Sequence, residues 1–174
     1  MKKRIGISDE FIKEARQLVD QGYYEQAILK LQKCLHWVNK QGKGATILYD
    51  LGYCFLRQGW YEEAVKIYSQ LLVINPLDND ARFFRASAYA SLKWTDEAIK
   101  ELKIILTSDP NDVLARHDLA LCYRDKGWLK ESLEEMRRAN TYATLYGESD
   151  EKEIVKSSLS HLEDETENGD DESK

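Results

Sequence analysis

Apolar side chains recur along this chain at helical spacing, and the pattern itself repeats. Between residues 45 and 78, one apolar stripe runs from Leu48 to Phe55 and a second from Ala64 to Leu72. Within each stripe the apolar residues stand three or four positions apart, which places them on one face of a helix. The pattern predicts two amphipathic helices joined by a turn. The same pair of stripes returns every 34 residues, except that the first step is 37 because three residues are inserted near 42–45.

Small residues and turn residues mark the same places in each period. Small side chains, which let two helices approach closely, stand at Ala15, Gly52, Ala86 and Ala120. The first helix is expected to end where φ is positive, a conformation that suits glycine. This place holds Gly22, Gly59 and Gly127, and Lys93 in the third period. Pro76 and Pro110 follow second helices, where a missing N–H stops the helix.

This combination resembles the tetratricopeptide repeat, a helix-turn-helix unit of this period. The resemblance implies an all-α fold, a right-handed α-solenoid of four repeats with a C-terminal capping helix, in a single domain at 8–163. We expect the repeats at about 8–44, 45–78, 79–112 and 113–147 and the capping helix at about 149–163. A basic N-terminal extension is expected at 1–7 and a disordered acidic tail at 164–174.

The capping helix and the tail are predicted from their own patterns. Asp150 followed by Glu153 resembles a capping box. Apolar residues from Ile154 to Leu162 then share one face, as a cover for the last repeat requires. After Glu163 no apolar stripe continues and acids dominate, which is typical of a disordered segment.

Bulk properties narrow the class of protein. No run of ~18 apolar residues occurs, so we expect no membrane insertion. Residues 1–8 are basic but lack an apolar core, which argues against a secretory signal peptide and favours the cytoplasm. The segment from Glu163 to Lys174 holds seven acids and one lysine, and therefore the whole net charge of −6. Because the remainder is neutral overall, no nucleic acid partner is expected.

The sequence contains no constellation typical of an enzyme. Phosphate loops, dinucleotide fingerprints, zinc pairs and nucleophile elbows are absent from it, so we expect no catalytic residue, no cofactor and no metal. Cys34, Cys54 and Cys122 stand at core positions of their repeats. On a helix, His117 and Asp118 point about 100° apart, so we interpret His117 as a surface residue rather than a base.

Candidate binding residues follow from the resemblance, which implies that the first helix of each repeat lines the concave face of a solenoid. The side chains expected in this groove, aromatic in the middle and flanked by arginines, are Arg16, Tyr49, Tyr53, Arg57, Phe83, Phe84, Ser87, His117, Leu121 and Arg124. Ile12 and Lys13 are expected beside Arg16. Aromatic residues and arginine are enriched in binding hot spots. In the alternative interpretation, Tyr49 and Phe83 pack between neighbouring repeats.

The leading hypothesis is a scaffold or adaptor, a monomeric and non-enzymatic interaction module that binds a peptide or helix of a partner protein in this groove. Two alternatives are a self-assembling scaffold, which would be a homo-oligomer, and a chaperone of the type III secretion translocator class. Some members of that class carry a string similar to Asp80–Phe84. In a further alternative, the acidic tail folds back onto the groove.

One known partner class is not expected. Tetratricopeptide domains that hold the tails of heat-shock chaperones use a clamp of two lysines, two asparagines and one arginine. The resemblance places these clamp positions at Ile12, Arg16, Asp50, Asp80 and Phe84. Since this set does not keep the clamp, the sequence argues against that partner.

Overall fold

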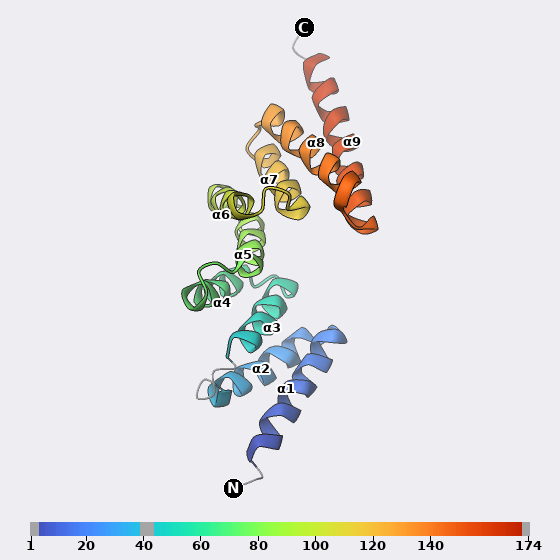
Figure 1. Cartoon of the computed structure of the whole chain (residues 1–174). Helices are drawn as coiled ribbons and strands as arrows, with labels where there is room; N and C mark the ends of the chain where they lie inside the picture. Colours follow the sequence, from blue (N-terminus) through green and yellow to red (C-terminus); the bar gives the residue numbers. More distant parts are fainter. Residues whose placement is uncertain (1–3, 39–43, 172–174) are drawn as a thin grey trace. The chain divides into compact units, whose positions relative to one another are not determined.

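The structure is a computed structural model that describes residues 4–38 and 44–171, with side chains described for 10–35 and 44–166. In these ranges the chain forms α-helices joined by turns, and no strand occurs within them (Figure 1). The helices are α1 (Arg4–Asp20), α2 (Tyr24–Val38), α3 (Gly44–Arg57), α4 (Tyr61–Ile74), α5 (Asn79–Ser91), α6 (Thr95–Ser108), α7 (Val113–Asp125), α8 (Leu129–Tyr146) and α9 (Ser149–Asp171). None of these described helices is long and apolar enough to cross a membrane.

The helices group into two compact units. Met1–Leu92 contains α1 to α5, and Lys93–Lys174 contains α6 to α9. In the first unit each helix packs against the next, and α1, α3 and α5 also touch in turn. In the second unit α9 packs on both α7 and α8. The predicted single domain at 8–163 stays a prediction, because the boundary between the units falls inside the third repeat.

First helices end on a residue in the left-handed region. The backbone φ is 78° at Gly22 and 75° at both Gly59 and Gly127, and Lys93 adopts 62° at the same place in the third repeat. The following residue closes the turn, as where the Trp60 N–H donates to the Phe55 carbonyl at 2.9 Å. A residue with a Cβ is strained at such a φ, so Lys93 is a weak point of its repeat.

An aspartate begins the first helix that follows each proline. Asp78 accepts a hydrogen bond from the Ala81 N–H at 2.9 Å, and Asp112 accepts one from the Ala115 N–H at 2.8 Å. A side-chain acceptor at this place satisfies one of the amides that a helix start leaves without a partner. These two caps fix the points at which α5 and α7 begin.

The core of the first unit is built around the ring of Tyr68 on α4, which is fully buried. The ring lies so close to Gly52 on α3 that a Cβ added there would come within 2.8 Å of the Tyr68 Cζ. Phe84 on α5 stacks on the same ring, with 5.4 Å between centroids. Tyr68 therefore joins three helices, which explains why the second period has glycine where the other periods have alanine.

In the second unit, Ala120 on α7 and Met136 on α8 belong to one buried cluster. Ser132 on α8 adds a buried hydrogen bond by donating to the Ala120 carbonyl at 2.7 Å. Val155 and Leu162 of α9 are buried in the same cluster, so α9 covers the end of the fourth repeat as predicted for the capping helix.

The prediction of a disordered tail from residue 164 is wrong for the described residues, because α9 continues as a helix to Asp171. Leu162 is buried, and Glu163 pairs with Arg137 of α8 at 3.0 Å, so the acidic segment begins on an anchored turn. No proline follows to stop the helix. Residues 172–174 lie outside the described residues.

Two helix starts also differ from expectation. The predicted capping box of Asp150 and Glu153 is shifted, because the Glu148 N–H donates to the Glu151 carboxylate at 3.2 Å. At the other end of the chain, α1 begins at Arg4, inside the predicted extension at 1–7. Residues 1–3 of that extension lie outside the described residues.

Candidate functional site

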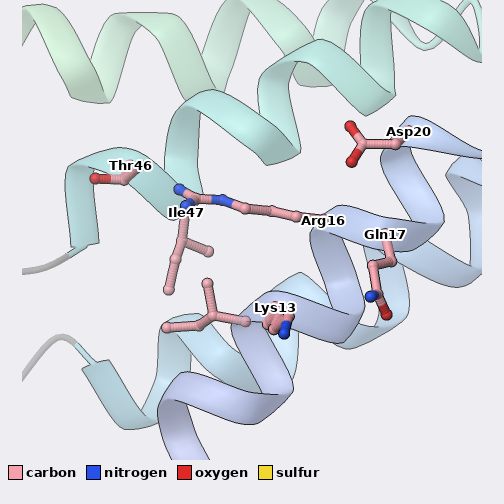
Figure 2. A pocket seen from close by; sticks show the side chains of 7 residues that line it. Lys13, Arg16, Gln17, Asp20, Thr46 and Ile47 are labelled. Carbon is pink, nitrogen blue, oxygen red and sulfur yellow. The ribbon is translucent and has the colours of Figure 1, made fainter.

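A pocket opens between α1 and α3 of the first unit. Its volume is about 650 Å³, and it is lined by Ile12, Lys13, Arg16, Gln17, Asp20, Thr46 and Ile47. Figure 2 shows the Arg16 side chain extending from α1 toward Ile47 on α3. The Arg16 Nε donates to the Asp50 carboxylate at 2.8 Å, which ties the first two repeats together and fixes the guanidinium. Ile12, Lys13 and Arg16 were expected on this side of the first repeat, and the structure places them around one hollow.

A cation–aromatic cluster continues from this pocket along α3. Asp50, Tyr53 and Arg57 are three and four residues apart and therefore share one helix face. The guanidinium carbon of Arg57 lies 5.9 Å from the Tyr53 ring centroid and 5.6 Å from that of Tyr24. Tyr53 remains 36% exposed to solvent. We call the surface formed by Arg16, Asp50, Tyr53, Arg57 and the pocket the α1–α3 face.

Tyr49 and Phe84 serve the packing between repeats. The Tyr49 hydroxyl donates a hydrogen bond to Asp78, the N-cap residue of α5. Burial, together with this bond, raises the pKa of the Tyr49 hydroxyl, which keeps its proton on the oxygen. The Tyr49 ring meets the Tyr68 ring edge-on, with 6.2 Å between centroids, and the Phe84 ring stacks on the Tyr68 ring. Both residues are half-buried against the core, an arrangement that matches the alternative interpretation of Tyr49.

Phe83 and Ser87 lie on α5 of the same unit and are also half-buried. The Phe83 ring meets the Phe84 ring edge-on at 6.0 Å between centroids. The Ser87 hydroxyl donates to the Phe83 carbonyl of its own helix at 3.2 Å. Seven of the ten predicted groove residues therefore belong to the first unit, and their role in binding stays a prediction.

The other three residues, His117, Leu121 and Arg124, belong to α7 of the second unit. His117 is only 8% exposed, so the expectation of a surface histidine is wrong. Its Nε2 lies 3.0 Å from the Ser158 Oγ of α9, which covers it. Leu121 packs half-buried against the core of that unit, and Arg124 lies 4.0 Å from the Asp125 carboxylate. A groove continuous over both units stays a prediction.

Asp118, His117 and Ser158 form a chain of hydrogen-bonding groups. The His117 Nδ1 lies 3.0 Å from the Asp118 carboxylate, although the two residues are neighbours on a helix. The order carboxylate, imidazole, hydroxyl is that of a nucleophile and its base. Ser158 lies in the middle of α9, where backbone amides are committed to the helix and supply no oxyanion hole. The chain of groups therefore holds α9 on α7.

The cysteines and acids of the described residues gather into no site. No group of three or more His, Cys, Asp or Glu side chains that could hold a metal ion occurs among them. Burial raises the pKa of the Cys54 thiol to about 12 and that of Cys122 to about 11, which disfavours the reactive thiolate.

Sequence comparison decides the family. A family model described as tetratricopeptide repeat matches residues 12–79 and 49–113, which together span more than half of the chain. The chain belongs to the tetratricopeptide repeat family. A search of curated protein sequences gives no match.

Solved structures show the same tetratricopeptide fold. MamA from Desulfovibrio magneticus RS-1 is 17% identical, with a TM-score of 0.69 over 90% of this chain and 93% of that one. Repeats of a putative kinesin light chain from Podosopora anserina are 17% identical, with a TM-score of 0.71 over 88% and 84%. PcrH, solved in complex with the chaperone binding region of PopD, is 18% identical, with a TM-score of 0.63 over 68% and 90%. The predicted all-α tetratricopeptide solenoid is confirmed.

The predicted groove set omits Tyr24, the pocket residues Gln17, Asp20, Thr46 and Ile47, and, in the second unit, the contact of Ser158 with His117. Tyr24 opens a second helix, so counting the faces of first helices could not include it. A usable signal existed, because a tyrosine recurs after the turn at Tyr24 and Tyr61. Ser158 lies 41 residues from His117, and only the packing of α9 brings the two together.

Proposed function

We propose that this tetratricopeptide protein is a non-enzymatic scaffold or adaptor, and that its α1–α3 face binds a peptide or helix of a partner protein. The observation that carries the proposal is the exposed Tyr53 ring beside Arg57, on the same face of α3 as Asp50, which binds Arg16 of the pocket. Binding hot spots are rich in tyrosine and arginine that flank such hollows. Side chains of a bound segment would enter the pocket while its backbone crosses Tyr53.

Charge at this face supports binding rather than core packing. Arg57 contacts two rings, and among the described side chains it has no ion-pair partner. A core residue would need its charge compensated. A cation held over aromatic rings and still open to solvent is available to a partner.

The test combines capture from native lysate with a footprint. The variant Tyr53→Ala/Arg57→Ala removes the exposed ring and the cation. The matched control, Tyr146→Ala/Lys152→Ala, removes one exposed tyrosine and one exposed cation from the second unit. Circular dichroism first confirms that both variants fold. A partner that wild type and control retain, that the double variant loses, and that slows hydrogen exchange in α1 and α3 supports the proposal.

Contrary outcomes are equally defined. A partner retained by all three proteins would place binding outside the α1–α3 face. Loss of the partner by the control variant as well would show that aromatic residues in general, rather than this face, determine capture.

A second candidate, a chaperone for a secreted translocator, is favoured by one observation, the likeness to PcrH. In this case the captured protein would be an apolar client that precipitates once it is released. Solubility of the separated partner distinguishes the two functions.

The adaptor proposal includes a monomer that acts in the cytoplasm. Sedimentation equilibrium at increasing concentration should give a constant mass near 20.2 kDa. A mass that rises with concentration would favour the self-assembling scaffold instead.

A further inference from the structure

We propose that the pocket between α1 and α3 receives an acidic residue and an adjacent apolar residue of the partner segment. The inference rests on the proposed function, since it names the chemistry that the α1–α3 face recognises. It follows from three features of the pocket: two cations, an apolar floor and the aspartate at one end.

Lys13 supplies the first cation. It is exposed at the pocket rim, and among the side chains that the structure describes it has no ion-pair partner. The other lysine that reaches α1, Lys30, is paired with Glu14. Lys13 is thus available to a ligand in the pocket.

Arg16 supplies the second cation in a fixed orientation. Asp50 accepts from its Nε, and no described group accepts from the two terminal nitrogens. The side chain is 45% exposed. A guanidinium held by one edge offers its remaining donors as a fork, which is the geometry that a carboxylate binds with two hydrogen bonds. Asp50 therefore positions Arg16 for a ligand as well as joining α1 to α3.

The floor of the pocket is apolar. Ile47 is almost fully buried, and Ile12 is half-buried and packs against the core. In Figure 2 Ile47 lies below the extended Arg16 side chain. An apolar side chain entering here packs mainly on Ile12, the more exposed of the two isoleucines, while a carboxylate on the next residue reaches Lys13 and Arg16.

Asp20 limits where the acid can sit. It lines the same pocket seven residues after Lys13, which is two helical turns or about 10.5 Å along α1. Its charge repels a carboxylate at that end. An acidic residue is therefore accepted beside Lys13 and Arg16 and disfavoured beside Asp20, so the pocket orients the segment.

The test uses three pools of fluorescein-labelled decapeptides, measured by fluorescence polarisation on the full chain. Each pool has a fixed central Leu-Glu, Leu-Gln or Leu-Lys, with the other eight positions an equal mixture of residues without cysteine. We expect the Leu-Glu pool to bind about tenfold tighter than the Leu-Lys pool at low salt, with Leu-Gln between them and the difference shrinking as salt rises.

Charge variants change the order of affinity of the three pools, whereas loss of folding would weaken the binding of all three. Lys13→Glu should invert the order of the pools, so that Leu-Lys binds tighter than Leu-Glu. Asp20→Asn should tighten the Leu-Glu pool a few-fold. The matched control is Lys33→Glu, which reverses an exposed lysine on α2 and should leave the order unchanged.

The outcomes separate the two proposals. If all pools bind equally, and Tyr53→Ala/Arg57→Ala weakens them, the acidic preference is overturned while the proposed function stands. If no pool binds and no lysate partner depends on Tyr53, both fail. If Lys33→Glu inverts the order as effectively as Lys13→Glu, only the net charge matters and the pocket is not the site.

Discussion

The contact between Gly52 and Tyr68 gives the sharpest stability prediction. An alanine Cβ at position 52 would lie 2.8 Å from the Tyr68 Cζ and 3.0 and 3.1 Å from two other ring atoms. The ring cannot move away, because it is fully buried and stacked on Phe84. Overpacking of this kind costs about 1–3 kcal/mol. Alanine offsets about 1 kcal/mol of that through its higher helix propensity. We expect Gly52→Ala to lower the free energy of unfolding by up to about 2 kcal/mol.

Other repeats of the same chain indicate how to relieve the clash. Ala15 lies in one buried cluster with Leu31, and Ala120 lies in another with Met136, so alanine accompanies an aliphatic partner. Tyr68→Leu alone should cost about 2–4 kcal/mol, because it leaves a cavity beside Gly52. In Gly52→Ala/Tyr68→Leu the added methyl occupies part of that space. The double variant should therefore be at least about 1 kcal/mol more stable than the sum of the single effects predicts.

Urea unfolding followed by circular dichroism at the helical band measures all four proteins. The comparison needs equal m-values, since a changed slope would mean a changed unfolded or native state. If Gly52→Ala is more stable than wild type by about 1 kcal/mol, helix propensity alone decides and the clash is absent. Strictly additive single effects would refute the argument that Gly52 and Tyr68 act as a pair.

Three further predictions concern single positions. Phe84→Ala should lower the free energy of unfolding by about 2 kcal/mol, below the 3–5 kcal/mol of a fully buried phenylalanine; a change near zero in urea titration would remove Phe84 from the core. Lys93→Gly should raise stability by about 0.5 kcal/mol, since relief of φ 62° outweighs loss of the exposed pair with Asp125, and thermal unfolding checks this. Cys54 and Cys122 should react with a thiol reagent at pH 8 at the rate of unfolding, because both thiols are buried out of reach of the reagent; immediate reaction of the native protein would contradict it.

The fold could be predicted because the same residue types recur at equivalent positions in several repeats. One copy of a glycine in a turn is weak evidence, but Gly22, Gly59 and Gly127 occupy the same place, and all three have positive φ. The repetition even predicted the exception, since Lys93 adopts the glycine conformation at the same turn of the third repeat. Local chemistry and the period agree at these positions, which is the condition for a sequence to specify one fold.

The site was predictable only in part, because the period gives a helix face and not what covers that face. The His117 position follows from helix counting, but its burial depends on Ser158 of α9, for which no other repeat is a template. The same holds for the end of α9. Nothing in the acidic composition after Glu163 indicates a helix, and the anchor on Arg137 is a tertiary contact.

Register within the repeat explains which predicted residues remain open. Ile12, Tyr49, Phe83 and His117 occupy one position of their repeats. Two of them contact the element that follows their repeat, since Tyr49 bonds Asp78, which begins α5, and His117 lies within hydrogen-bond distance of Ser158 of the capping helix α9. This position serves the joint between repeats, so aromatic character there indicates packing before it indicates a ligand.

Four residues later the same helices present a different register. It holds Arg16, Tyr53, Ser87 and Leu121. Arg16 lines a pocket and Tyr53 is the partly exposed ring over which Arg57 lies. Ser87 of this register bonds its own helix, and Leu121 packs against the core of the second unit. Arg16 and Tyr53 are the exposed members of the register on the α1–α3 face, so we propose that the specificity of this face resides in these two side chains.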